Sequence, residues 1–168
     1  MPTAVGSQQA ITCQPEHQCF CVLGVRVDVV QIPDVIARME EWIRHRSGCH
    51  FIAVTGMHGV TEAQHDPKFK EILNAAGMVV PDGYPLAWLG RRKGFSHLVR
   101  RVYGPELMAT FCDQTAPRGH RHFFYGAAEG VAEELARRFS ERYPGLVVAG
   151  TSVSSDVKLG RSAARGMA

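Results

Sequence analysis

The sequence has no run of 18 or more apolar residues, and its N-terminus lacks the basic-then-apolar layout of a signal peptide. The first absence predicts that nothing in it spans a membrane, and the second makes the cytoplasm the default compartment. The 168 residues are 45% hydrophobic and 21% charged, which excludes the disordered and collagen-like classes. We therefore expect one cytoplasmic domain with a hydrophobic core.

Cysteine is sparse and unpaired in the sequence. The five cysteines are an odd number and contain no CxxC pair: Cys13, Cys19, Cys21, Cys49 and Cys112. This usage favours reduced thiols over a structural disulfide, so we expect no disulfide. Histidines 45, 50, 58 and 65 lie near Cys49, but their spacing matches no closed zinc pattern, and no metal site is predicted.

A complete GxGxxG fingerprint is also missing. The segment Gly56-Met57-His58-Gly59 resembles only the start of one, which disfavours an NAD-dependent oxidoreductase. The net charge of +3 is too small to indicate nucleic acid, and no recognised nucleic-acid motif is present. We therefore expect neither a cofactor nor a nucleic-acid partner.

Positive charge is concentrated in one segment, residues 91–101, which contains no acidic residue. Its cations are Arg91, Arg92, Lys93, Arg100 and Arg101. Such a segment suits phosphate or an anionic membrane surface, and a solvated basic loop between helices is the alternative.

Apolar spacing predicts alternating strands and helices after a polar, disordered tail at residues 1–18. Two short strands are predicted at 20–29, bent at Gly24 to form a small hairpin or a bent edge strand. Further strands are predicted at 50–55, 78–80, 121–125 and 146–149. Helices are predicted near 32–47, 59–65, 66–77, 85–90, 104–114 and 131–143. This order predicts an α/β, Rossmann-like fold, with a mostly parallel sheet and helices on both faces.

Three predicted strand ends carry candidate site residues: Thr55, Asp82 and Gly126. Parallel connections place them on one edge of the sheet, where ligands of open α/β sheets bind. Asp82 ends the stretch Val79-Val80-Pro81-Asp82-Gly83 and is a candidate acid or base. The alternative is that Asp82 and Gly83 only form a turn.

Four motifs in order resemble those of the WecG/TagA/CpsF glycosyltransferases, over about residues 20–151. They are residues 54–63 (VTGMHGVTEA), 81–83 (PDG), 101–107 (RVYGPEL) and 123–126 (FFYG). The resemblance implies inverting transfer of a sugar, often of N-acetylmannosamine type, from a UDP donor to a polyprenyl-diphosphate-linked acceptor. It implies a role in bacterial surface polysaccharides and no DxD metal motif.

The resemblance assigns Asp82 as the catalytic general base. A carboxylate can take the acceptor's proton while a fixed cation offsets charge on the leaving diphosphate. As substrate-binding residues we expect Thr55, His58, Gly83, Arg101, Gly104 and Gly126.

Two positions depart from the family pattern. Met57 stands where many members have asparagine, with His58 the candidate to serve that contact, and Arg100 stands where members often have glutamate. 

Family members also continue past residue 151 with further β/α units and a basic membrane-docking tail. We therefore expect an incomplete domain at 19–151 and a non-family tail at 152–168, as a frameshift would produce. The alternative to an enzyme is an inactive sugar-nucleotide-binding or interaction fragment, whose exposed sheet edge pairs with another chain, including a second copy. Full-length relatives imply peripheral contact with the inner face of the plasma membrane.

Overall fold

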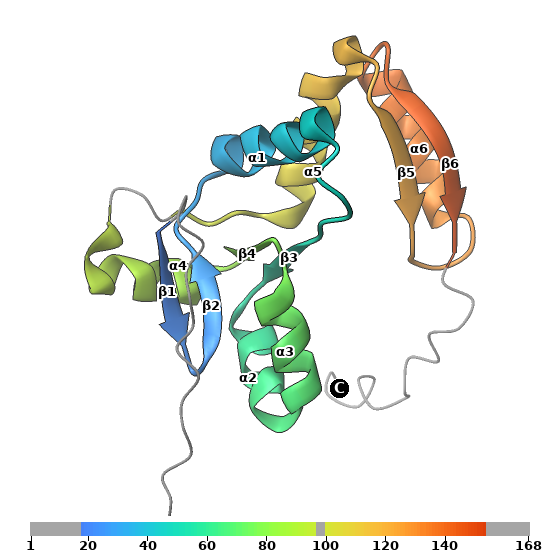
Figure 1. Cartoon of the computed structure of the whole chain (residues 1–168). Coiled ribbons are helices and arrows are strands. Elements are labelled where there is room, and N and C mark those ends of the chain that lie inside the picture. The colour runs from blue at the N-terminus through green and yellow to red at the C-terminus, as the bar shows by residue number, and fades with distance from the viewer. Residues whose placement is uncertain (1–17, 97–99, 154–168) are drawn as a thin grey trace, which may run out of the picture. The chain divides into compact units, whose positions relative to one another are not determined.

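The computed structural model describes residues 18–96 and 100–153. Strands and helices alternate within them, which confirms the α/β, Rossmann-like class (Figure 1). The chain divides into two compact units between Leu107 and Met108, and each unit is described by itself.

The first unit contains β1 (Cys19–Val22), β2 (Val25–Asp28), α1 (Ile32–His45), β3 (Ile52–Thr55), α2 (Met57–His65), α3 (Pro67–Ala75), β4 (Met78–Pro81), α4 (Tyr84–Gly90) and the π-helix η1 (Arg91–Phe95). Helix α5 (Gly104–Thr115) contains the boundary, and η2 (Ala116–Arg118), β5 (Arg121–Tyr125), α6 (Val131–Arg142) and β6 (Val147–Ser152) follow.

The first unit contains two strand pairs. Strands β1 and β2 form an antiparallel hairpin, because Leu23 and Gly24 adopt φ values of 50° and 81°, as a tight two-residue hairpin turn requires. Strands β3 and β4 are parallel, and their register pairs Ile52 with Met78 and Thr55 with Pro81. The two carboxyl ends therefore lie side by side.

Strand β2 departs from its sequence pattern. Its alternation predicts a half-buried strand, but all four residues are buried, including Arg26 and Asp28. Asp28 accepts the Val79 N–H at 2.7 Å, and Arg26 donates to the Ala76 carbonyl at 2.7 Å and lies 3.5 Å from Asp28. These charges can be buried because they pair with each other and satisfy backbone groups. The network attaches β2 to β4.

Helices α2 and α3 meet at Asp66, whose side chain accepts the Phe69 N–H at 3.0 Å. Asp66 is therefore the N-cap of α3, with Pro67 in the first turn. Valines on the strands and on α2 form the core of this unit with Leu86 from α4; Val25, Val27, Val60, Val79 and Leu86 are fully buried.

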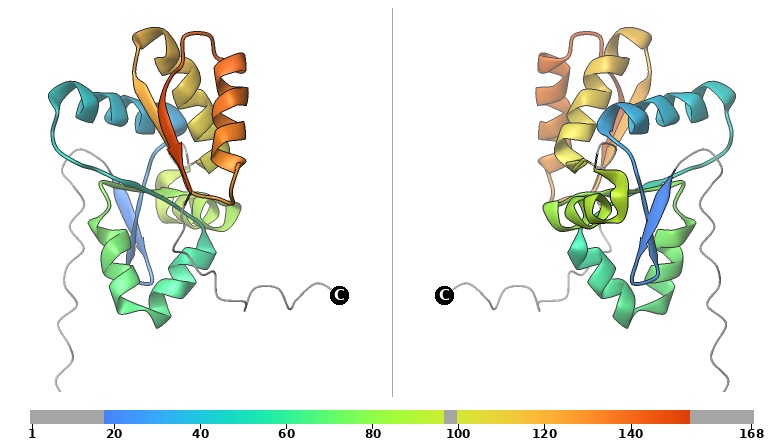
Figure 2. Two further views of the ribbon diagram at one scale, coloured as in Figure 1. Left: turned by 90° about the vertical axis from the view of Figure 1, so that its right-hand side faces the viewer. Right: turned by 90° about the vertical axis from the view of Figure 1, so that its left-hand side faces the viewer.

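The second unit is a parallel pair, β5 and β6, with α6 packed along it (Figure 2). Phe124 faces inward and packs with Cys112, Ala132 and Tyr143. On the other face Phe123 and Tyr125 are exposed. The register shifts between His122 and Phe123, so β6 has one more residue than the pairing needs.

Three predictions need correction or remain open. Cys19 is disulfide-bonded, so the expectation of no disulfide is wrong, whereas Cys21, Cys49 and Cys112 are free. The basic segment is not entirely a loop, since residues 91–95 extend α4 as η1. Gly126 follows β5 in the second unit, so its place beside Asp82 stays a prediction.

Across the described ranges, each helix is too short or too polar to cross a bilayer. Most of the predicted tail at 152–168, and nearly all of the tail at 1–18, lies outside those ranges.

Candidate functional site

Asp82 is held by backbone hydrogen bonds on both sides of its strand. Its N–H donates to the Thr55 carbonyl at 2.9 Å, which extends the parallel pairing of β3 and β4 by one step. On the other side, the Val102 N–H donates to the Pro81 carbonyl at 2.8 Å. Two segments distant in sequence therefore fix the backbone that carries this carboxylate.

Arg101 lies beside Asp82. Its Nε is 3.6 Å from the Asp82 Oδ1, and the side chains are 54% and 29% exposed. The Arg101 guanidinium stacks over the Tyr103 ring, with its carbon 4.4 Å from the ring centroid. A pair this exposed contributes little stability, about 0–1 kcal/mol, so folding does not require it. Both groups remain accessible to a ligand.

Glycines allow the two strand ends to approach closely. A Cβ on Gly56 would lie 2.7 Å from the Asp82 carbonyl oxygen, and a Cβ on Gly59 would overlap the Thr55 hydroxyl. Gly83 adopts φ 143°, a left-handed conformation that favours glycine. The turn after β4 and the start of α2 therefore depend on residues without side chains.

Thr55 is buried, at 8% exposure, and its hydroxyl donates to the Gly56 carbonyl at 3.4 Å. The structure brings it next to Asp82 through its backbone carbonyl. His58 is exposed in the first turn of α2, whereas Met57 packs against the core of the first unit. Met57, which stands where many family members have asparagine, is thus a partly buried core residue here.

Gly104 begins α5 close to β3, since a Cβ there would lie 3.4 Å from the Val54 Cγ1. Gly126 closes the other strand pair: its N–H donates to the Ser152 carbonyl at 2.9 Å, with φ 108°. The first unit therefore brings together Thr55, Asp82, Gly83 and Arg101, and Gly126 belongs to the second unit.

Sequence reasoning missed the role of Tyr103. The signal was available, because residues two apart in an extended segment project to the same side. The spacing of Arg101 and Tyr103 therefore allows the guanidinium to stack on the phenol ring.

The second unit contains a buried polar cluster around His122. Its Nε2 is 3.0 Å from the Thr115 hydroxyl oxygen and its Nδ1 is 3.8 Å from the Cys112 sulfur. Thr115 donates its own proton to the Phe111 carbonyl, so the hydroxyl oxygen accepts from Nε2–H, and Nδ1 is left as an acceptor. Burial, and then the charge of His120, lowers the pKa of His122, and burial raises the pKa of Cys112 to about 11. The cluster is neutral and structural.

No three His, Cys, Asp or Glu side chains gather as a possible metal site in the part of the chain that the structure describes.

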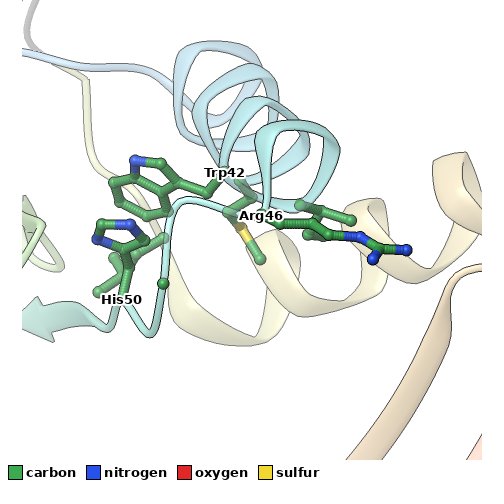
Figure 3. Close-up of a pocket in the computed structure, with 7 residues that line it drawn as sticks. Trp42, Arg46 and His50 are labelled. Atoms are coloured by element: carbon green, nitrogen blue, oxygen red, sulfur yellow. The ribbon is translucent and has the colours of Figure 1, made fainter.

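A pocket of about 380 Å³ lies at the opposite end of β3 from Asp82, where the chain passes from α1 to Ile52. The Trp42 indole stacks on the His50 imidazole at 4.4 Å, and the Arg46 side chain extends away from both (Figure 3). Because Asp82 follows the far end of the β3–β4 pair, the pocket is separate from the candidate site.

Comparison with known proteins finds the same family that the four sequence motifs resemble. The model of the glycosyl transferase WecG/TagA/CpsF family matches residues 20–160. A relative from Bacillus spizizenii (strain ATCC 23059 / NRRL B-14472 / W23) is 32% identical over 91 residues. It is named N-acetylglucosaminyldiphosphoundecaprenol N-acetyl-beta-D-mannosaminyltransferase. The match covers 54% of this chain and 35% of the relative, so it spans about a third of that protein.

Proposed function

Because the chain belongs to the WecG/TagA/CpsF family of glycosyltransferases, we propose that it transfers a sugar from a UDP-sugar to a polyprenyl-diphosphate-linked acceptor. The sugar is of N-acetylmannosamine type and the anomeric carbon is inverted. The relative's printed name supports this choice, since it joins an N-acetyl-beta-D-mannosaminyl group with a diphosphoundecaprenol-linked N-acetylglucosaminyl group. The product enters bacterial surface polysaccharide, and the reaction takes place at the inner face of the plasma membrane.

Asp82 is the general base in this proposal. The acceptor hydroxyl oxygen forms a bond to the anomeric carbon, the bond from that carbon to the diphosphate oxygen breaks, and UDP leaves. The hydroxyl proton passes to the Asp82 carboxylate. The observation that carries the proposal is a partly exposed carboxylate held at a strand end by backbone bonds on both sides.

Arg101 offsets the charge of a diphosphate in this proposal. A guanidinium can donate two parallel hydrogen bonds to phosphate oxygens, and Arg101 is exposed enough to do so. Stacking on Tyr103 limits its rotamers and holds the charge near Asp82. His58, Gly83, Gly104 and Gly126 complete the proposed substrate contacts, with Thr55 adjacent to the base.

Turnover of a panel of UDP-sugars, with a polyprenyl-diphosphate-linked acceptor, tests the proposal. We expect UDP release that requires both substrates, and a product whose anomeric configuration is opposite to that of the donor. Donor binding without transfer would favour the sugar-nucleotide-binding fragment. Absence of both binding and transfer across the panel would contradict the proposal.

A further inference from the structure

The outer face of α4 and η1 is basic and aromatic. We call it the basic–aromatic surface and define it as Tyr84, Trp88, Arg91, Arg92 and Lys93. All five are exposed, Tyr84 at 68% and Trp88 at 44%. The opposite side of α4 is buried through Leu86, Ala87 and Gly90. The segment is therefore amphipathic, and its solvent face carries large rings and cations.

Each arginine of this surface stacks on a ring of the preceding turns. The guanidinium carbon of Arg91 lies 5.2 Å from the Tyr84 centroid, and that of Arg92 lies 5.3 Å from the Trp88 centroid. A guanidinium over a ring keeps its edge N–H groups free to donate to anions. Rings and donors thus form one continuous face.

This face is fixed to the core of its unit. Phe95, the last residue of η1, stacks on Phe20 with centroids 6.2 Å apart, and Leu89 and Phe95 pack against the core. Gly94 adopts φ 98°, which lets the chain turn so that Phe95 points inward. The surface is therefore presented by a packed segment.

We propose that the basic–aromatic surface docks on an anionic lipid bilayer. Residues 84–96 contain three cations and no acidic residue, which complements anionic headgroups. Tyrosine and tryptophan favour the level of the headgroups, where one end of the side chain is apolar and the other is wet. The arginine and lysine stems can lie along the rings while their charged ends contact phosphate.

A bilayer fits this surface better than RNA. Single-stranded nucleic acid binds by stacking bases on open aromatic faces. Here Arg91 covers one face of Tyr84, and Arg92 covers one face of Trp88. Each ring is therefore partly covered by a cation of the same segment and does not offer two open faces to a base.

The surface begins two residues after Asp82 in the sequence. Docking would hold the candidate base close to the membrane that carries a polyprenyl-linked acceptor; this consequence rests on the proposed function. The docking itself does not, and it can be measured without donor or acceptor.

The test is binding of the full chain to phosphatidylcholine vesicles with and without 30% phosphatidylglycerol. The variant Arg91→Gln/Arg92→Gln is compared with Arg44→Gln/Lys68→Gln, which removes two exposed cations elsewhere in the same unit. A cation near an anionic surface contributes roughly fivefold in partitioning, so the first variant should bind about 25-fold more weakly. The control variant should change binding by less than about threefold, and high salt should release the wild type.

Tryptophan fluorescence gives a second measurement. In a Trp42→Phe background Trp88 is the remaining tryptophan, and its emission should shift to shorter wavelength on anionic vesicles. The proposal is overturned if the wild type does not bind anionic vesicles, if both double variants bind equally, or if Trp88 emission does not shift. Binding to single-stranded RNA in place of vesicles would also overturn it. Each of these results is independent of sugar transfer, so it leaves the proposed function unaffected.

Discussion

The Nε atom of Arg101 lies 3.6 Å from Oδ1 of Asp82, beyond hydrogen-bond distance but within reach as an ion pair. The cation is thus placed next to the candidate base without a tight bond that would hold it there. A diphosphate with more negative charge than one carboxylate can compete for the guanidinium. The geometry therefore suits a site where Arg101 gives up its contact with Asp82 and pairs with the diphosphate of a substrate.

Arg101→Lys should weaken binding of the UDP-sugar or of the acceptor diphosphate. The charge is retained, but an ammonium cannot reproduce the paired hydrogen bonds or the stacking on Tyr103. We expect at least about a tenfold higher Kd for one ligand, the scale of one charge-assisted hydrogen bond. Titration calorimetry with each ligand measures this, with the exposed Arg44→Lys as control. Equal affinity of mutant and wild type for both ligands would assign Arg101 to the solvated surface.

Gly56→Ala should destabilise the first unit and disturb the site. The added Cβ would lie 2.7 Å from the Asp82 carbonyl oxygen, a backbone atom that cannot rotate away. Forced overpacking of this kind costs about 1–3 kcal/mol. Gly104→Ala is the matched control, because its Cβ would meet the Val54 Cγ1 at 3.4 Å. Urea unfolding should show a lower midpoint for Gly56→Ala alone; equal midpoints would mean that the strand ends are not packed this closely.

Asp28→Ala should be more destabilising than removal of an exposed carboxylate. It leaves Arg26 charged and buried and leaves the Val79 N–H without its acceptor. Breaking a buried pair by removing one partner costs about 3–5 kcal/mol. Glu71→Ala, on the exposed side of α3, should stay within about 0.5 kcal/mol of wild type. Chemical denaturation compares the two, and a loss below about 1 kcal/mol for Asp28→Ala would contradict the network.

The second unit should lose stability as the pH falls below about 6.5. Burial lowers the pKa of His122 in the folded state, so the unfolded chain takes up the proton first. The stabilisation is complete above the unfolded pKa and is lost as the pH falls toward the folded pKa, by at most about 1.4 kcal/mol per pH unit. Hydrogen exchange of the β5 amides between pH 7.5 and 5 measures this.

His122→Gln should flatten that pH dependence, whereas exposed His65→Gln on α2 should leave it unchanged. The same slope in wild type and His122→Gln, after correction for intrinsic exchange, would show that another group titrates.

Much of the fold could be predicted because several helices have periodic apolar residues, β4 ends at a proline, and β3 and β5 are each followed by a glycine. Helix α6 begins at the predicted Val131 and ends one residue before the predicted Tyr143. The contact between the ends of β3 and β4 also follows from sequence, since consecutive parallel strands share an edge.

The remainder depends on partners distant in sequence. The burial of Arg26 depends on Ala76, which lies 50 residues away, and periodicity alone places a charged residue in solvent. Residues 91–95 are kinked at Gly94, and Phe95 beyond the kink packs on Phe20, which is distant in sequence. The spacing of apolar residues within one segment cannot predict contacts between segments that are distant in sequence.

The central claim is tested most directly by turnover of Asp82→Asn beside the wild type, with the UDP-sugar and acceptor that the panel identifies. Asparagine keeps the size of the side chain and the backbone bond to Thr55 but cannot take the acceptor's proton. We expect kcat to fall by about 10² to 10⁴ with the Kd of the donor nearly unchanged. Unchanged turnover would contradict the assignment of Asp82 as the base, and an equal loss of donor binding would make it a ligand-binding or structural residue.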